Sequence, residues 1–390
     1  MKGVCETSSR EMKILTINCT DITKIGGVNY SIKRVAEELV KRGHDCCVLS
    51  INPGNLPREE CINGVNVIRV KSPIAKHLYW FSPSMAQFLR RNLGKSLKPD
   101  IGHIHQYRSL LTPEVAYLLR GRHLPFVFSP YYAREEYNTL AGKYLLGYYK
   151  PLGILAFKWA ERVATVSEYS KNMVMKDFGM PSEKIVLILP GVDNLETSKS
   201  KVGKAKDTPI SLLSAGVLIE KKGIHYIIQA LSELKRHGRQ ACLTIIGEGD
   251  YERELENLAK KVGVEGSISW YKPLPREDLH QKVMEADIFL LLSRSEGYGI
   301  VIAEALASGT PCIVTKTTAL MEFLTEPGCF GVNYPPDPNE VADLIIKIHD
   351  SEVKVGPLSN KIRTWDEVAV DYEKVYEQIL NLYEVRKREK

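Results

Sequence analysis

Several features that mark other classes of protein are missing from this sequence of 390 residues. None of the eight cysteines forms a C-x-x-C pair, so we expect free thiols in a reducing compartment, with neither a zinc site nor a disulfide framework. The longest apolar stretch, from Tyr144 to Phe157, is interrupted by Lys150 and is too short to span a bilayer. The first ten residues lack the apolar core of a signal peptide. These absences predict a cytoplasmic protein without a transmembrane helix.

Two functional classes are disfavoured by further absences. No G-x-G-x-x-G opens a helix after the first predicted strand, which argues against a dinucleotide-dependent oxidoreductase. No recognised module arranges aromatic and basic side chains for nucleic acid, so nucleic-acid binding is not expected. Repeats and low-complexity tracts are also missing. The composition, with 44% hydrophobic and 26% charged residues, is that of an ordinary folded protein.

Basic charge is concentrated in one half of the chain. Residues 1–195 contain 27 Lys and Arg against 17 Asp and Glu, whereas the remainder contains 26 against 30. The net charge of the whole chain is only +6, so the sum hides this difference. A basic N-terminal half is suited to an anionic surface or ligand.

Short β-branched runs alternate with amphipathic helical patterns along the chain, which predicts βαβ units and parallel sheets. We therefore predict an α/β protein with two Rossmann-like, doubly wound domains facing each other across a cleft. The predicted parts are a domain over 1–194, a polar, lysine-rich linker over 195–209, a second domain over 210–364 and a helix over 365–390 that packs back on the first domain. The predicted strands are Lys13–Asn18, Cys46–Ile51, Val65–Val70, Ile101–His105, Phe126–Ser129, Arg162–Val166, Ile185–Leu189, Ile210–Ala215, Cys242–Ile246, Ser267–Trp270, Ile288–Leu292 and Cys312–Val314.

Ligands of doubly wound sheets bind beyond the carboxyl ends of the strands, so three glycine-containing turns after strands are of interest. Gly26-Gly27 lets the backbone approach an anion at a helix N-terminus, although a tight turn explains the pair equally well. The segment Gly216–Gly223 carries Lys222, which can neutralise a phosphate or simply be solvated. The segment Gly247–Gly249 either caps the next helix or lies against a nucleotide.

A fourth turn is more specific. The strand Ile288–Leu292 leads into Glu296-Gly297-Tyr298-Gly299 and then into a nearly all-apolar helix that contains Glu304. Because that helix must be buried on most sides, Glu304 is costly unless it is paired or bound to a ligand. Both carboxylates can point into one crevice, and the glycines leave the first amides of the helix free for a phosphate. Carboxylates that can bind hydroxyls, next to backbone amides that can bind phosphates, are the features expected of a sugar nucleotide site.

Together these segments resemble the retaining glycosyltransferases of family GT4 (glycosyl transferases group 1), which have the GT-B fold. The stretch from Glu296 to Glu304 resembles the E-x7-E motif of that family. The resemblance runs through nearly the whole chain, in order and in spacing. Its other segments are Gly26-Gly27, Arg42-Gly43-His44-Asp45, Pro99–His105, Ala164–Glu168, Pro190–Asp193, Lys222-Gly223 and Gly247–Gly249.

The resemblance implies an acceptor-binding N-terminal domain, a nucleotide-sugar-binding C-terminal domain, and site residues in the latter. Glu296 would bind the donor sugar hydroxyls, Glu304 the ribose, and Lys222 the diphosphate, with Glu296 and Lys222 as the catalytic residues. The remaining implied donor-binding residues are Gly27, Gly216, Gly247, Glu248, Gly299 and Ile300. The implied reaction is a same-face displacement with retention, without a metal or other cofactor, in which the leaving diphosphate accepts the proton of the acceptor. Fixed amides and a lysine stabilise a departing dianion of this kind.

Two positions depart from the family pattern. Val217 stands where the family usually has an arginine that binds phosphate bidentately. Tyr131 stands where a histidine is common, and together with His105 it marks a candidate acceptor or base region. These departures concern the identity of the donor and the turnover, and they leave the predicted fold unchanged.

Two N-terminal segments are candidates for contact with a membrane. His77–Lys98 and Tyr131–Trp159 combine aromatic and apolar residues with interspersed Lys and Arg. Basic amphipathic helices of this kind can lie on anionic lipid, which would place the protein peripherally on the inner face of the cell membrane. Ordinary helices with an apolar face on the sheet and a basic face in water would have the same pattern.

The predicted function is transfer of a sugar from a nucleotide-diphosphate sugar to a lipid-linked or glycan acceptor, by a hexosyltransferase-type enzyme of polysaccharide or glycolipid biosynthesis (class EC 2.4). A non-hydrolysing sugar-nucleotide epimerase, which shares the two-domain architecture, is one alternative. The other alternative is a weakly active sugar-nucleotide-binding protein, which the departures from the family pattern at Val217 and Tyr131 suggest.

Overall fold

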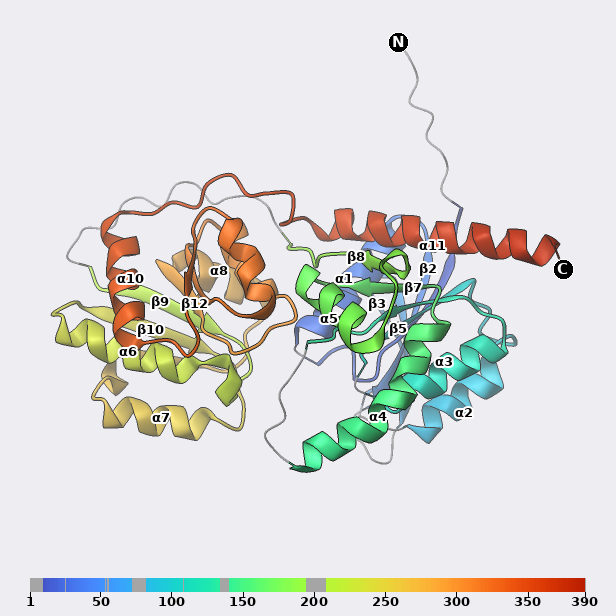
Figure 1. Cartoon of the computed structure of the whole chain (residues 1–390), viewed down its shortest axis with the longest axis horizontal. Coiled ribbons are helices and arrows are strands. Elements are labelled where there is room, and N and C mark those ends of the chain that lie inside the picture. The colour runs from blue at the N-terminus through green and yellow to red at the C-terminus, as the bar shows by residue number, and fades with distance from the viewer. Residues whose placement is uncertain are drawn as a thin grey trace, which may run out of the picture.

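The protein consists of two α/β domains that lie side by side (Figure 1). The computed structural model describes residues 10–24, 26–52, 54, 56–71, 82–107, 109–133, 140–193 and 208–389, and of residues 140–149 only the backbone. Residues 195–207 of the predicted linker over 195–209, and parts of both candidate membrane segments, fall outside these ranges. The two doubly wound sheets that the alternating pattern predicts are confirmed.

The first sheet has the order β3-β4-β2-β1-β5-β6-β7-β8. Its strands are β1 (Lys13–Ile17), β2 (Asp45–Asn52), β3 (Glu59–Ile62), β4 (Val65–Lys71), β5 (Ile101–His105), β6 (Phe126–Ser129), β7 (Arg162–Thr165) and β8 (Ile185–Leu187). All neighbours are parallel except β3 and β4, which form an antiparallel hairpin at the edge. The sequence pattern predicted parallel strands only and missed β3, because this short edge strand is mostly exposed and buries no apolar face.

The second sheet has the order β11-β10-β9-β12-β13-β14 and is parallel throughout. Its strands are β9 (Ile210–Ala215), β10 (Ala241–Ile246), β11 (Ile268–Tyr271), β12 (Ile288–Leu291), β13 (Cys312–Thr315) and β14 (Cys329–Val332). The edge strand β14 was not predicted, because its CFGV sequence is short and contains a glycine.

Helices cover both faces of each sheet. They are α1 (Gly27–Lys41), α2 (Pro83–Asn92), α3 (Leu111–Gly121), α4 (Leu140–Trp159), α5 (Glu168–Phe178), α6 (Ile224–Arg236), α7 (Glu252–Lys261), α8 (Arg276–Glu285), α9 (Ile300–Ala307), α10 (Pro338–Asp350) and α11 (Trp365–Arg388). Consecutive residues of a strand point to opposite faces, so Ile14 and Leu15 of β1 enter separate apolar clusters, as do Leu212 and Leu213 of β9. No helix in the described ranges is both long and apolar enough to cross a membrane.

Helix α11 follows the second domain in the chain but packs on α1 of the first domain (red in Figure 1). A capping box fixes its start, since Thr364 and Glu367 each bond the backbone amide of the other. Its stripe of Val368, Tyr372 and Tyr376 is buried against the sheet. The polar anchor is Glu373, 4% exposed.

Two side chains of the turn between α1 and β2 bond the Glu373 carboxylate. Arg42 Nε donates to Oε2 at 2.7 Å, and His44 Nε2 lies 3.1 Å from Oε1. The Arg-Gly-His turn of the sequence thus anchors the last helix of the chain, a structural role for one segment of the family resemblance.

Replacing Glu373 tests this anchor. We expect Glu373→Ala to cost about 3 kcal/mol, because it leaves the buried His44 and the Arg42 guanidinium without their carboxylate. In a thermal unfolding scan this corresponds to a midpoint roughly 6 to 12 °C lower. Gln378→Ala, on the exposed side of the same helix, is the matched control and should leave the midpoint within about 2 °C. Equal midpoints for the two variants would contradict the assignment.

Candidate functional site

The order of the strands places the site. In the second sheet β9 lies between β10 and β12, so the chain leaves β9 on one side and returns on the other. In the first sheet β1 is flanked in the same way by β2 and β5. Ligands of open parallel sheets bind beyond the carboxyl ends of strands at such points. The turns after β9, β12 and β1 carry the predicted residues Lys222, Glu296 and Gly27.

Lys222 and Glu296 form an ion pair at this point of the second sheet. The Lys222 Nζ lies 2.6 Å from the Glu296 Oε1, and the side chains are 20% and 14% exposed. Ser293 Oγ donates to the same carboxylate oxygen at 2.7 Å. The Glu296 amide donates to Thr318 Oγ1 at 2.9 Å, which fixes the backbone of the loop. The second carboxylate oxygen of Glu296 carries none of these bonds and is available to a hydroxyl of a ligand.

Glycines allow the turn after β9 to touch the turns after β10 and β12 backbone to backbone. A Cβ on Gly247 would lie 1.9 Å from the carbonyl oxygen of Gly216, and a Cβ on Gly223 would lie 2.0 Å from that of Leu292. Both residues also have positive φ, 152° and 70°. Close loop packing therefore accounts for Gly247 and Gly223 without a ligand, and it sets the position of Lys222 next to Gly223.

Helix α9 begins at the junction between the domains. Its N-cap, Gly299, has a φ of 109°, which favours glycine. A Cβ on Gly27, the first residue of α1, would lie 3.4 Å from Ile300 Cδ1, so the N-termini of α1 and α9 face each other across the junction. Both helix ends present backbone amides, and a helix N-terminus attracts anions.

Glu304 lies inside α9 and is paired, as its burial requires. Arg276, the first residue of α8, donates to its carboxylate, and the Glu304 side chain is 15% exposed. Burial raises the pKa of Glu304 to about 7, although the Arg276 guanidinium acts to lower it. The sequence indicated that Glu304 needs a partner. It did not identify Arg276 as that partner, because polar residues are common at the start of a helix.

The Arg276 guanidinium also contacts the first domain. It lies 3.7 Å from the centroid of the Tyr30 ring of α1, a cation–π contact. The Tyr30 hydroxyl donates to Asp193, and Arg34 Nε donates to the other oxygen of Asp193 at 3.0 Å. Tyr30, Asp193 and Arg276 were missed as site residues, because nothing local in the sequence shows that three distant segments meet.

A second set of contacts joins Gly297, in the loop before α9, and Glu322 to the first domain. Ser167, the N-cap of α5, donates through its hydroxyl to the carbonyl of Gly297 at 2.7 Å. The amides of Glu168 and Tyr169 donate to the Glu322 carboxylate at 3.2 and 2.9 Å. Glu322 thus stabilises the positive end of a helix in the opposite domain.

The candidate acceptor or base region is largely buried. His105 is 4% exposed, and its ring stacks on that of Tyr131 at 5.9 Å between centroids. Burial keeps the pKa of His105 well below its ordinary value and raises that of Tyr131. The neighbouring His103 bonds Tyr376 and Ser129 at 2.6 and 2.8 Å. Both histidines are neutral at pH 7, and His103 has a packing role.

Two predicted positions lie apart from the paired carboxylates. Glu248 is exposed, and in the described structure its side chain bonds neither Glu296 nor Glu304. Its backbone carbonyl accepts from the amide of Leu218 at 2.9 Å. Val217, which replaces the usual arginine of the family, is 50% exposed.

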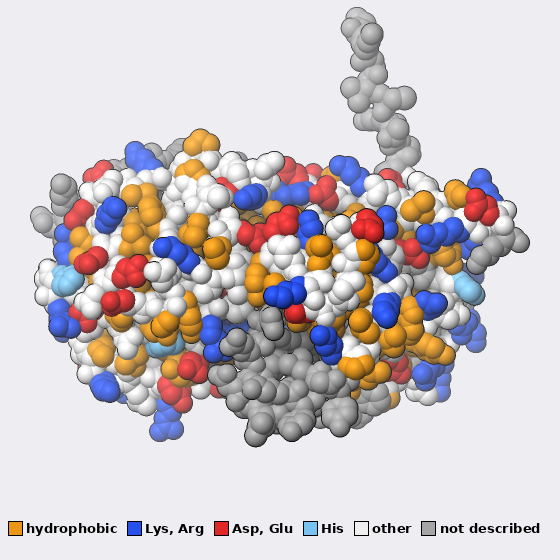
Figure 2. All heavy atoms as spheres, in the orientation of Figure 1, with side chains coloured by type: hydrophobic (Ala, Val, Ile, Leu, Met, Phe, Trp, Pro, Cys, Tyr) orange, Lys and Arg blue, Asp and Glu red, His pale blue; other side chains and the backbone are white. Residues whose placement is uncertain are grey.

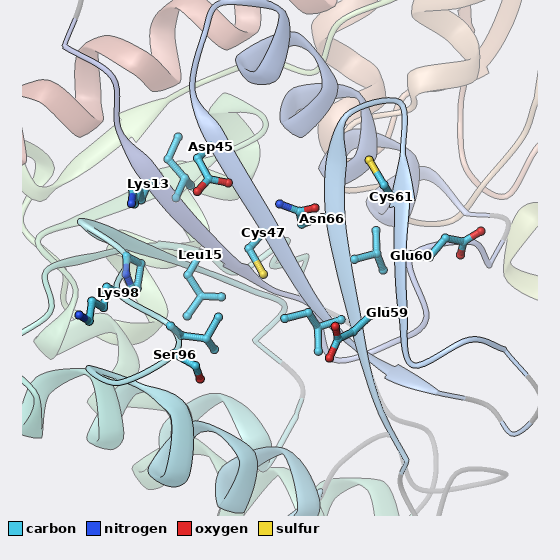
Figure 3. Close-up of a pocket in the computed structure, with 15 residues that line it drawn as sticks. Lys13, Leu15, Asp45, Cys47, Glu59, Glu60, Cys61, Asn66, Ser96 and Lys98 are labelled. Carbon is cyan, nitrogen blue, oxygen red and sulfur yellow. The ribbon is translucent and has the colours of Figure 1, made fainter.

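A separate groove of about 590 Å³ lies on the first sheet (Figure 3). Lys13 and Asp45, which begin β1 and β2, stand at one end of it, so the groove lies at the amino ends of the strands, away from the turns described above. Its lining mixes these charges with the half-buried thiol of Cys47 and with Lys98. This mixed lining singles out no class of ligand.

Two doubly wound domains that meet at the carboxyl ends of their strands define the GT-B class of fold. Solved structures agree: the chain superposes on Anabaena HepE in complex with UDP and glucose with a TM-score of 0.69, 19% identity and coverage of 97% of this chain and 99% of that one. Sequence models of two families match, Glycosyltransferase Family 4 over residues 25–194 and Glycosyl transferases group 1 over residues 196–365. The chain therefore belongs to the group 1 glycosyltransferase family.

Two relatives illustrate this membership. An uncharacterized glycosyltransferase of Methanocaldococcus jannaschii is 29% identical over 339 residues, which is 82% of this chain and 84% of the relative. The amylovoran biosynthesis glycosyltransferase AmsK of Erwinia amylovora is 30% identical over 212 residues, about half of either chain (53% and 52%).

The charge of Glu304 gives a stability test. Because its pKa in the folded protein is raised to about 7, ionisation between the ordinary value and pH 7 destabilises the fold, by about 2 to 3 kcal/mol once complete. We expect the melting temperature of Glu304→Gln, relative to wild type, to rise by roughly 5 °C or more between pH 5 and pH 8. Arg239 lowers the pKa of Asp350, so the difference in melting temperature between wild type and Asp350→Asn, the control, should stay constant between pH 5 and pH 8 and shrink only in stronger acid. A difference for Glu304→Gln that is constant with pH would contradict the burial argument.

Proposed function

We propose that the protein transfers a sugar from a nucleotide-diphosphate sugar to a lipid-linked or glycan acceptor with retention of configuration. The observation that carries this proposal is the Lys222–Glu296 pair, with Nζ and Oε1 2.6 Å apart, at the carboxyl ends of β9 and β12. In this pair Lys222 is the cation that would bind a diphosphate, and Glu296 is the carboxylate that would bind sugar hydroxyls. The complexes of HepE with UDP and glucose support a nucleotide sugar as the donor.

In the proposed mechanism Lys222 stabilises the charge that develops on the departing diphosphate, together with amides at the start of α9. Glu296 holds the donor sugar through its hydroxyls, and Ser293 and Thr318 keep that carboxylate and its backbone in place. The diphosphate takes the proton of the acceptor hydroxyl as the new glycosidic bond forms on the same face. Lysine and amides supply the positive charge, so we propose that no metal is needed.

Removing either member of the pair tests the proposal. With a panel of nucleotide sugars and lipid or glycan extracts, we expect Lys222→Ala and Glu296→Ala to lower acceptor-dependent release of nucleoside diphosphate by at least about 100-fold. Lys272→Ala removes a lysine from a surface pair with Glu252 of the same domain and should keep wild-type rates. Full activity of both pair variants would remove the proposed site.

The product separates the reaction from its alternatives. Retention predicts that the anomeric proton of the product has the coupling constant of the donor anomer, and that excess EDTA leaves the rate unchanged. An inverted product would contradict the mechanism. A free epimeric sugar nucleotide, formed without acceptor, would show an epimerase.

We further propose that the acceptor side of the enzyme rests on an anionic membrane. In the first domain Arg90 and Arg91 of α2 and Arg122 after α3 are exposed, and Tyr117 of α3 is 63% exposed. Figure 2 shows basic and apolar side chains close together over this part of the surface, at the lower right. Each basic residue near an anionic surface contributes about 1 kcal/mol of attraction. The relative AmsK is named for amylovoran biosynthesis, which supports a polysaccharide pathway for this protein.

Vesicle sedimentation tests the membrane proposal. We expect salt-sensitive binding to vesicles containing phosphatidylserine, and the double variant Arg90→Glu, Arg91→Glu should weaken it by roughly 30-fold or more. Lys260→Glu, Lys261→Glu, on α7 of the second domain, reverses the same number of charges and should bind as wild type does. Absence of wild-type binding at low salt would overturn the proposal.

A further inference from the structure

Arg276 is the residue at which the two domains and the nucleotide site meet. It starts α8 of the second domain, pairs with Glu304 of α9, and lies over the ring of Tyr30 from α1 of the first domain. Its side chain is 35% exposed. One guanidinium thus contacts an anion on its own domain and an aromatic face on the other.

The surroundings hold the Tyr30 ring in place from two further directions. The ring meets that of Trp365, the first residue of α11, edge to face with centroids 5.8 Å apart. The Tyr30 hydroxyl donates to Asp193, which Arg34 also bonds. Arg276 therefore stacks on a ring that cannot move away from it easily.

Glu304 has little else to keep it charged. The remaining charged groups near the pair are Asp193, whose negative charge opposes ionisation of Glu304, and Arg34 beyond it. One turn further along the same faces of α8 and α9, His280 bonds the Ser308 hydroxyl at 3.2 Å. Among the described residues near Glu304, Arg276 is thus the cation that supports its ionised form.

We propose that Arg276 is a positioning residue for the donor: it keeps the Glu304 carboxylate ionised and oriented toward the ribose of the nucleotide, and Tyr30 of the opposite domain holds Arg276 in that place. The inference rests on the proposed function, together with the contact between Glu304 and the ribose that the family resemblance implies. A protonated carboxyl accepts fewer hydrogen bonds, so donor affinity depends on a ring that the acceptor domain supplies.

Nucleotide binding measures this role directly. Calorimetric titration of the full chain with UDP, ADP and GDP first identifies the nucleoside diphosphate that binds. For that ligand we expect Arg276→Gln to raise Kd about tenfold or more at pH 7, and to regain affinity between pH 7 and pH 9. The recovery follows because loss of the guanidinium moves the pKa of Glu304 upward, so that its ionisation needs higher pH. Wild type should instead gain affinity mainly between pH 6 and pH 8.

Conservative variants separate positioning from folding. Arg276→Lys keeps the positive charge and should keep the shape of the wild-type pH profile, with weaker binding because lysine cannot stack on Tyr30 as the planar guanidinium does. Tyr30→Leu should weaken binding roughly three- to thirtyfold, whereas Tyr30→Phe, which keeps the ring, should stay within about threefold. Arg239→Gln breaks an arginine–carboxylate pair with Asp350 elsewhere in the second domain and is the matched control.

The outcomes distinguish the inference from the function on which it rests. Wild type that binds none of the nucleotides would overturn both. Wild type that binds, with an Arg276→Gln profile superimposable on its own, would overturn the positioning role and leave the proposed function standing. A pH-independent loss in Arg276→Gln that Arg276→Lys does not restore would also overturn it.

Discussion

The carboxyl ends of parallel strands meet at one edge of a sheet, and this constraint assembles the site. Lys222 and Glu296 are 74 residues apart in sequence, yet β9 and β12 are neighbours and their following turns touch. The same constraint in the first sheet brings Gly27 to the edge that faces α9. The glycines after β9 and β10 then let the turns pack closely enough for the pair to form.

Charge is handled locally at this junction. The second half of the chain is slightly acidic overall, with 26 basic and 30 acidic side chains, although it carries the proposed phosphate contacts. Lys222 and Arg276 each pair with one carboxylate, and each pair is largely shielded from water. The surplus of positive charge lies in the other half, and the exposed Arg90, Arg91 and Arg120 place part of it on α2 and α3.

Sequence patterns predicted most strands of both sheets and placed candidate site residues in the turns that follow strands. Periodicity located most strands, and the apolar helix around Glu304 implied a partner for its carboxylate. The patterns failed where local sequence carries no energetic signature: the exposed edge strand β3 buries no face, and Arg276 looks like any polar residue in a first helical turn. The pairing of Arg276 with Tyr30 depends on how two domains dock, which no window of sequence contains.

The chain passes between the domains twice, and the described residues beside the two crossings, up to Asp193 and from Thr364, lie against each other. A Cβ on Gly191 would come within 2.7 Å of the Trp365 nitrogen, and Val192 and Thr364 form an isolated bridge. Because both connections pass close to this contact, a rotation between the domains would turn about it. Tyr30 bonds Asp193 on one crossing and meets Trp365 on the other. The Tyr30 ring under Arg276 therefore lies next to the axis of such a rotation, where displacements would be smallest.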